Sequence, residues 1–251
     1  MNHPKLVIKI GGNEVDNPAF LAGLVDVIKS LKDSHTVIVH GGGKEIARLQ
    51  NALGLTPSFI EGLRVTDGPS LDVAEMVLSG LVNKRLVGRL VSAGVPAVGL
   101  SGVDLGLLRV EKMTHPAGDL GWVGRIVEVR PEALDSLLVQ GLVAVISPIS
   151  LGLDGHTYNV NADHAAMAVA QAMKASQLIF VSNVPGVLIG DQLVPRLSAR
   201  RAEGWIESGK ITGGMVPKVR SALEGVAAGI GQVRITDLAG LQKGTGTALV
   251  L

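Results

Sequence analysis

The chain begins with two short apolar runs that each end in glycines, KLVIKIGG at residues 5–12 and HTVIVHGGG at residues 35–43. Each run has the composition of a buried strand that ends in a turn, and an amphipathic stretch follows each one, over about 18–32 and 44–53. Strands that alternate with helices predict a parallel sheet with helices on both faces. The opening segments therefore predict an α/β protein.

The same alternation continues to the end of the chain. We predict a long helix that starts within 66–72 and ends near residue 93. The other expected elements are strands at 95–102 and 142–149, hairpins over 104–130, a helix over 163–175, a strand and hairpin within 176–194, helices near 198–208 and 214–229, and closing strands in QVRITD (232–237) and TALVL (247–251). No linker is visible, so a weak seam near residue 175 would divide one domain into two lobes, 1–175 and 176–251.

Composition excludes several classes of protein. The 251 residues include 23 lysines and arginines against 22 aspartates and glutamates, so the charge favours neither nucleic acid nor an anionic membrane as partner. Aromatic residues make up only 2%, too few for a surface that stacks bases. Cysteine is absent, which excludes disulfides and cysteine-bound zinc. Because neither a secretory signal nor a membrane-spanning run is visible, we expect a cytoplasmic protein.

Lys9 lies inside the first apolar run, just before Gly11 and Gly12. A buried lysine without an anionic partner costs several kcal/mol. Three strands end in glycine-rich turns, KIGGNE, VHGGGKE and GLSGVD, and at the carboxyl edge of a parallel sheet such turns let backbone N–H groups approach an oxyanion. Any one of them could be only a tight turn, but together with Lys9 they predict a phosphate or carboxylate site.

Two common nucleotide-binding motifs do not account for that site. The dinucleotide pattern G-x-G-x-x-G is absent from the chain. The segment GWIESGK at 204–210 matches G-x-x-x-x-G-K, but Ile211 stands where a Walker motif needs Ser or Thr, and a helical stretch precedes it where the motif needs a strand. We therefore reject it as a P-loop.

A polar cluster occurs in TYNVNADHAA, where Asn159, Asn161 and Asp163 alternate and would share one face of an extended segment. Asp163 could simply cap the following helix, but a cap leaves the two asparagines unexplained. Lys218, in TGGMVPKV, could be an ordinary surface lysine. Paired with Lys9, it would suit phosphoryl transfer, which depends mainly on stabilising negative charge.

Arg64, in GLRVTD, is a candidate clamp for a carboxylate, although most arginines are only surface charges. The histidines show neither a helical i, i+4 pair nor a nearby carboxylate at ligand spacing. We interpret them as structural and expect no metal site held by protein side chains; they are residues 3, 35, 40, 115, 156 and 164.

Eight segments, in this order, resemble motifs of the amino acid kinase family over essentially the whole chain: KIGGNEV, VHGGGKEI, GLRVTD, GLSGVD, YNVNADHAA, VSNVPGVL, TGGMVPKV and GTGTALVL. The resemblance implies a three-layer αβα sandwich around a mostly parallel sheet of about eight strands. GLRVTD, NVNAD and GGMVPKV are most similar to the members that phosphorylate N-acetyl-L-glutamate. The implied reaction is transfer of the ATP γ-phosphoryl group to the γ-carboxylate of N-acetyl-L-glutamate, the second step of arginine biosynthesis, with Mg²⁺ held mainly by the nucleotide phosphates.

The resemblance also implies a role for each candidate residue. Lys9 and Lys218 would stabilise the transferring phosphoryl group, and Asp163 would orient both lysines. The acceptor would bind on the lobe 1–175, at Gly42, Gly43, Arg64 and Asn159. ATP would bind mainly on the lobe 176–251, at Gly11, Gly12, Ser182, Asn183, Val184, Gly186, Leu188, Lys210, Thr212, Gly213, Gly214 and Met215.

Two alternatives stay open at this point. Asn183 replaces the aspartate that many members carry in this turn, and a similar SNVPG turn occurs in kinases that phosphorylate carrier-protein-bound aminoadipate in lysine biosynthesis. A nucleotide or amino acid sensor with the same fold is the other alternative, but it would not need Lys9, Asp163 and Lys218 together. Because arginine-inhibited hexameric members have an extra N-terminal helix for which we see no room before Lys9, we expect an arginine-insensitive homodimer.

Overall fold

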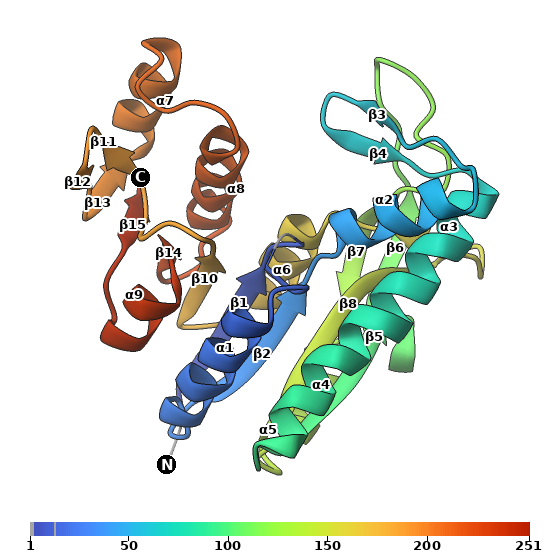
Figure 1. Cartoon of the computed structure of the whole chain (residues 1–251), viewed down its shortest axis with the longest axis horizontal. Helices are drawn as coiled ribbons and strands as arrows, with labels where there is room; N and C mark the ends of the chain where they lie inside the picture. Colours follow the sequence, from blue (N-terminus) through green and yellow to red (C-terminus); the bar gives the residue numbers. More distant parts are fainter. Residues whose placement is uncertain (1–2, 13) are drawn as a thin grey trace.

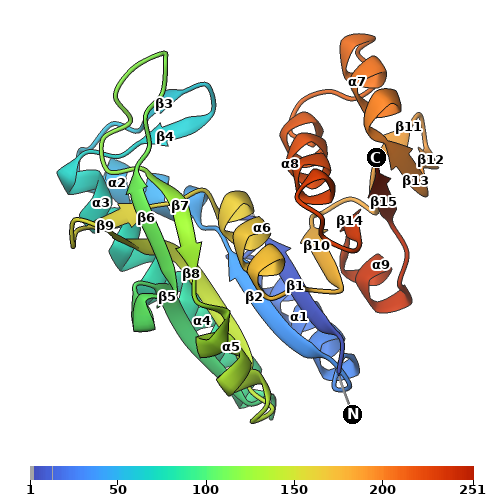
Figure 2. The ribbon, with the colours of Figure 1, turned by 180° about the vertical axis from the view of Figure 1, so that it is seen from behind.

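The computed structural model describes residues 3–12 and 14–251. Its described part contains one sheet of eleven strands in the order β13-β15-β14-β10-β1-β2-β8-β6-β7, with β5 and β9 also paired to β8. Helices lie on both sides of this sheet, as the two opposite views show (Figures 1 and 2). The predicted αβα sandwich with a mostly parallel sheet is therefore confirmed.

The strands of the main sheet are β1 (Lys5–Ile10), β2 (His35–His40), β5 (Ala97–Gly102), β6 (Leu108–Lys112), β7 (Gly124–Val129), β8 (Val143–Gly152), β9 (Thr157–Asn159), β10 (Gln177–Val181), β13 (Arg196–Ser198), β14 (Val233–Thr236) and β15 (Thr247–Val250). The pairs β6–β7, β8–β9 and β14–β15 are antiparallel, and the other neighbours run parallel. Strands β9 and β13 were not predicted, because three residues are too few to show a period.

Two small hairpins lie outside the main sheet: β3 (Ser58–Ile60) with β4 (Leu63–Val65), and β11 (Leu188–Ile189) with β12 (Gln192–Leu193). The hairpin β11–β12 was predicted from the sequence, whereas β3–β4 was not. Arg64 lies in the middle of β4, so the unpredicted hairpin carries a candidate site residue.

The helices are α1 (Pro18–Ser30), α2 (Gly43–Ala52), α3 (Gly68–Glu75), α4 (Asn83–Ser92), α5 (Pro131–Leu138), α6 (Ala162–Ala172), α7 (Ala199–Glu207), α8 (Met215–Ala227) and α9 (Leu238–Lys243). A π-helical segment, η1 (Met76–Val82), joins α3 to α4, and a short 3-10 turn, η2 (Asp104–Gly106), follows β5. The long helix predicted up to residue 93 is thus present, but it contains a π-helical stretch. Helices α5 and α9 were missed.

Alternation along β1 divides the core into two layers. Val7 belongs to the core layer that includes residues of α5, α6, α7 and α8, whereas Ile8 and Ile10 belong to the layer that includes residues of α1, α2, α3, α4 and α9. Full burial of each such side chain contributes about 1.5–3 kcal/mol. Since strand side chains alternate with a period of two, Lys9 projects to the same face as Val7, toward α6.

Side-chain caps set the starts of several helices. The Asn17 side chain accepts hydrogen bonds from the N–H groups of Ala19 and Phe20 at the start of α1, and Pro18 follows as the first helical residue. Asp67 caps α3 by accepting from the N–H of Ser70. None of the helices within the described residues is both long and apolar enough to cross a bilayer.

Candidate active site

Lys9 and Asp163 meet at the carboxyl edge of the sheet. The Nζ atom of Lys9 lies 2.7 Å from Oδ1 of Asp163, and their side chains are only 12% and 19% exposed. Lys9 is next to last in β1, and Asp163 lies in the first turn of α6, so the strand and the helix on its face bring them together. The structure therefore joins two of the three predicted catalytic residues.

The cap of α6 is Asn161, whose Oδ1 accepts a hydrogen bond from the N–H of Asp163 at 2.8 Å. This rules out the simple alternative that Asp163 caps its own helix, because Asn161 holds the cap position and the Asp163 carboxylate is turned to Lys9. Asn159 has a separate role, since its Nδ2 donates to Oγ1 of Thr66 at 3.2 Å. The three alternating polar residues thus serve three different contacts.

Lys218 of α8 belongs to the same charge cluster. It is half-buried in the first turn of α8, and burial is the main cause that lowers the pKa of its ammonium group. The nearby carboxylates of Glu14 and Asp163 act against that shift, and the positive charge of Lys9 adds to it. The Lys218 ammonium therefore lies within electrostatic reach of Lys9 and of the carboxylates of Glu14 and Asp163.

The glycine turns after β1 and β2 touch each other through their backbones. A Cβ atom added to Gly12 would lie 2.6 Å from the backbone nitrogen of Gly43, and one added to Gly11 would collide with the Glu14 carboxylate. The N–H of Gly41 donates to the carbonyl of Ile10 at 3.0 Å. Glycine is required at position 12 because any side chain would separate the two turns.

Gly42 is closely packed against the π-helical segment η1. A Cβ atom there would lie 2.7 Å from Cδ2 of Leu78, which belongs to the π-helical segment η1. Gly42 precedes the first residue of α2, so its turn leads into a helix N-terminus, where backbone N–H groups lack partners within the helix. The predicted anion-binding geometry of this turn has a structural basis in that helix start.

Arg64 reaches this turn from the hairpin β3–β4. Its Nη2 donates to the carbonyl of Gly43 at 3.1 Å, and its Nη1 donates to Oε1 of Gln50 at 2.6 Å. The guanidinium carbon lies 4.8 Å from the ring centroid of Phe59, a cation–π contact. Because a guanidinium has five N–H donors, three remain for a ligand.

Two segments predicted to bind nucleotide lie on different elements. The turn 182–187 directly follows β10, the strand beside β1, and Leu188 begins β11. In the segment 210–215, Gly213 has the left-handed φ of 57°, Gly214 precedes α8, and Met215 is its first residue. The side chains of Asn183, Lys210 and Thr212 are exposed. The segment 204–210 begins inside the helix α7, which agrees with the rejection of the P-loop.

Thr247 supports the turn 182–187, and it was not predicted from the sequence. It is fully buried in β15, where its Oγ1 accepts from the N–H of Val187 at 2.8 Å and donates to the carbonyl of Val194 at 2.6 Å. Gly186 lies against it, with a φ of 148° and no room for a Cβ atom. Only the pairing of distant strands makes this contact, so no local pattern could have indicated it.

His40, interpreted as structural, is fully buried at the end of β2. Its Nδ1 donates to the carbonyl of Gly41 at 3.0 Å, and its Nε2 lies 3.3 Å from Nδ2 of Asn83. Burial, the largest cause, lowers the pKa of His40 to about 4. The ring is therefore neutral at pH 7 and connects the second glycine turn to α4.

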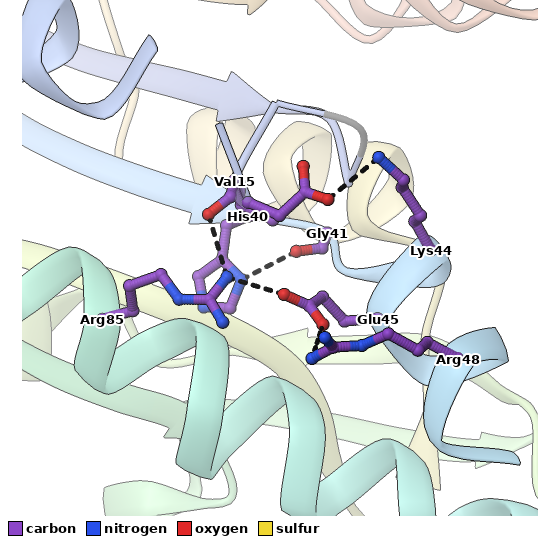
Figure 3. A network of polar contacts seen from close by, with 8 residues as sticks. Val15, His40, Gly41, Lys44, Glu45, Arg48 and Arg85 are labelled. Atoms are coloured by element: carbon purple, nitrogen blue, oxygen red, sulfur yellow. Dashed lines mark hydrogen bonds and ion pairs between the residues drawn. The ribbon is translucent and has the colours of Figure 1, made fainter. Parts of the chain in front are cut away.

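A network of ion pairs flanks the same two turns (Figure 3). Arg85 of α4 contacts Glu45 of α2 and the carbonyl of Val15, while Arg48 pairs with the other oxygen of Glu45. None of these residues was predicted from the sequence. Glu45 is a buried acid within an amphipathic helix, which is the one local signal that could have drawn notice.

The donor set suits an anion and not a protein-held cation. In the part of the chain that the structure describes, no group of three or more His, Cys, Asp or Glu residues is placed to hold a metal ion. Asp163 is already paired with Lys9.

A cavity of about 360 Å³ lies at the opposite edge of the sheet, lined by residues that include His35 and Val143, the first residues of β2 and β8. Ligands of parallel α/β sheets bind outside the carboxyl ends of the strands. The glycine turns, Lys9 and Asp163 are at that carboxyl edge, so we place the candidate site there and not in the cavity.

Comparisons with known proteins found related sequences and similar structures. Residues 4–237 match the model of the amino acid kinase family. The acetylglutamate kinase of Roseiflexus castenholzii is 52% identical over 96% of this chain and 93% of that protein. Two solved structures are similar: smu.665 from Streptococcus mutans (TM-score 0.84, 32% identity, 98% of both chains) and the N-acetylglutamate synthase from Neisseria gonorrhoeae complexed with coenzyme A and N-acetyl-glutamate (TM-score 0.86, 27% identity, 100% of this chain and 60% of that one).

Proposed function

The chain belongs to the amino acid kinase family, and we propose on that premise that it transfers the γ-phosphoryl group of ATP to the γ-carboxylate of N-acetyl-L-glutamate. It is an enzyme, a kinase, as its curated relatives are. The observation that carries the proposal is the Lys9–Asp163 pair at the carboxyl edge of the sheet, with Lys218 in the same charge cluster. Phosphoryl transfer requires positive charge beside the transferring group, and these two lysines would supply it.

In this reaction an oxygen of the acceptor carboxylate forms a bond to the γ-phosphorus. The bond from that phosphorus to the β,γ-bridging oxygen breaks, and ADP leaves with its electron pair. The acceptor is already ionised at neutral pH, because a glutamate side chain has a pKa near 4.3, so no general base is needed. The protein has to position the two substrates and stabilise the negative charge of the transition state.

We assign that charge stabilisation to Lys9 and Lys218. Lys9 would contact the γ-phosphoryl oxygens from β1, and Lys218 would contact them from the nucleotide side. Asp163 would hold the two ammonium groups in place between turnovers, which its 2.7 Å contact with Lys9 supports. Burial of these charges strengthens each interaction relative to water.

The acceptor would bind between the second glycine turn and the hairpin β3–β4. Arg64, whose guanidinium has donors left after its bonds to Gly43 and Gln50, would bind a carboxylate of N-acetyl-L-glutamate. The backbone of Gly42 and Gly43 and the side chain of Asn159 would complete this site. The residues proposed to bind ATP are Gly11, Gly12, Ser182, Asn183, Val184, Gly186, Leu188, Lys210, Thr212, Gly213, Gly214 and Met215. The division into an acceptor lobe, 1–175, and an ATP lobe, 176–251, is part of the same proposal.

Mg²⁺ would enter with ATP and neutralise phosphate charge. We further propose that the reaction serves arginine biosynthesis in the cytoplasm and that the enzyme is a homodimer. Gel filtration with light scattering tests the last point, and a monomeric mass would contradict it. The alternative acceptor, an aminoadipate or glutamate carried by a protein, is not favoured by relatives named acetylglutamate kinase at 45–52% identity.

The direct test traps the acyl phosphate with hydroxylamine while ADP release is followed. N-acetyl-L-glutamate and N-acetyl-L-aminoadipate are offered separately with ATP and Mg²⁺. Lys9→Ala is compared with Lys5→Ala, which removes an ion-paired lysine from the other end of the same strand. We expect hydroxamate with N-acetyl-L-glutamate, retained in Lys5→Ala and lost in Lys9→Ala. Wild-type protein that phosphorylates neither acceptor would contradict the proposal and point to a carrier-bound acceptor or a sensor.

A further inference from the structure

We propose that Arg85 is a positioning residue that holds the glycine turn after β1 in register with the glycine turn after β2. The inference rests on the proposed function, in which the first turn contacts the phosphoryl group and the second contacts the acceptor. Arg85 itself would touch neither substrate. It would act through the two loops that do.

The geometry of Arg85 supports this role directly. Arg85 lies in the first turn of α4, just after the π-helical segment η1. Its Nη1 donates to the carbonyl of Val15 at 3.2 Å and to Oε1 of Glu45 at 2.7 Å. Val15 lies in the loop between β1 and α1, and Glu45 lies in the first turn of α2. Figure 3 shows the guanidinium group of Arg85 between these two partners. One nitrogen with two hydrogens therefore joins the loop after β1 and the first turn of α2 to α4.

Among the described residues, Arg85 is the only charged residue outside α2 that pairs with Glu45. Its side chain is 5% exposed, and its two oxygens pair with Arg85 and Arg48. Arg48 lies three residues further along α2 and is 73% exposed, so its bond stays within one helix. A buried carboxylate that loses one partner bears a large desolvation cost. The contact with Arg85 is thus both the link between elements and a strong constraint on α2.

The two turns need such a link because they meet through glycine. The backbone contact of Gly12 with Gly43 leaves no side chains between them that could interlock. A second ion pair, between Lys44 and Asp16 at 2.9 Å, also joins the two segments, but Lys44 is 60% exposed. Exposed pairs contribute little because water screens them. Of these two side-chain links, the one made by Arg85 is the better shielded from water.

The rate of phosphoryl transfer depends strongly on the distance between the reacting groups. A displacement of about 1 Å between reacting groups can cost about 100-fold in rate. Loosening the contact between the two turns would change their mutual position without removing a group that binds ATP or the acceptor. We therefore expect kcat to fall much more than either KM changes.

The experiment compares Arg85→Met with Arg48→Met. Both variants remove a guanidinium from the same carboxylate of Glu45, but only the first breaks a link between elements. Steady-state kinetics are normalised to the folded fraction measured by circular dichroism. Hydrogen exchange of the amides of residues 14–17 is measured without substrates, and Arg85→Lys tests rescue by a shorter set of donors.

We expect Arg85→Met to lower kcat about 10- to 100-fold, with both KM values within about threefold of wild type. Exchange at residues 14–17 should accelerate in this variant, and Arg85→Lys should recover part of both properties. Arg48→Met should resemble wild type in kcat and exchange. These results together would support the positioning role.

Equal kcat values for the two methionine variants, or unchanged exchange in Arg85→Met, would overturn the inference. A fall in kcat that disappears after correction for the folded fraction would also overturn it, because stability alone would then explain the loss. Wild-type protein that forms no acyl phosphate would instead refute the proposed function. The exchange data need no activity, so the two failures remain distinguishable.

Discussion

Lys9 and Asp163 form an ion pair 2.7 Å long, although one lies in the first strand and the other at the start of the sixth helix. The pair compensates a lysine charge in the apolar first strand when no phosphate is bound. A charge that is mostly removed from water needs such a partner to be stable. The same carboxylate therefore serves stability in the free enzyme and orientation during the proposed transfer.

Replacing Asp163 with Asn should lower kcat about 100-fold or more, because Lys9 loses the group that orients it. It should also lower the free energy of unfolding by about 1–3 kcal/mol, since a mostly buried ammonium is left without its partner. Asp135→Asn is the matched control, as Asp135 pairs with Lys5 at 2.7 Å but is 41% exposed. Acyl phosphate assays and urea denaturation measure both quantities. Equal effects of the two substitutions would contradict the role given to Asp163.

Arg64→Lys should raise the KM for N-acetyl-L-glutamate about tenfold or more and leave the KM for ATP nearly unchanged. Lysine keeps the positive charge but lacks the planar fork, so it cannot bond Gly43, Gln50 and a carboxylate at the same time. Initial rates over a matrix of both substrates separate the two constants. A larger effect on ATP would mean that Arg64 belongs to the nucleotide site.

Gly12→Ala should remove most of the activity and lower the free energy of unfolding by about 1–3 kcal/mol. Its Cβ atom would have to move the backbone of Gly43, from which it would be 2.6 Å away. Gly88→Ala, in α4 with open space around its Cα, is the control and should be neutral or stabilising by up to about 1 kcal/mol. Thermal unfolding and the hydroxamate assay test both. Full activity in Gly12→Ala would show that the two turns need not touch.

The fold should lose stability as the pH falls from about 6.5 to about 4. The pKa of His40 is about 4 in the folded chain and 6.5 in its ordinary state, so between these values the unfolded chain binds the extra proton. The contribution of His40 to the free energy of unfolding is therefore fully present above pH 6.5. It declines between pH 6.5 and pH 4 and stays at its reduced value below pH 4. This difference in pKa corresponds to a loss of about 3 kcal/mol in the free energy of unfolding across the window.

Urea denaturation at several pH values measures this effect in wild type and in His40→Gln. The variant should show a shallower dependence on pH, because its side chain does not titrate. His156→Gln is the control, since it removes a 64% exposed imidazole and leaves His40 in place. A slope in His40→Gln equal to that of wild type would assign the acid sensitivity to another group.

Local sequence patterns accounted for most of the regular elements. The apolar run ending in Gly11 and Gly12, the amphipathic helices and the hairpin β6–β7 were all visible as periods and turns in neighbouring residues. The pattern failed for β9, β13 and the hairpin β3–β4, each with strands of three residues, and for the helices α5 and α9. Elements that short are stabilised by their neighbours in space, and a periodic signal needs more residues than they contain.

The sequence by itself determined the order of strands and helices, the glycine turns at the ends of β1 and β2, and the identity of the charged residues Lys9, Asp163 and Lys218. These are properties of adjacent residues. Only the tertiary structure decided that Asn161 caps α6 and so frees Asp163 for Lys9, and that Arg85 joins Val15 to Glu45. The cap depends on the local backbone conformation at Asn161, and the ion pairs depend on distances of about 3 Å between atoms that the sheet and its helices bring together. Spacing along the chain specifies neither.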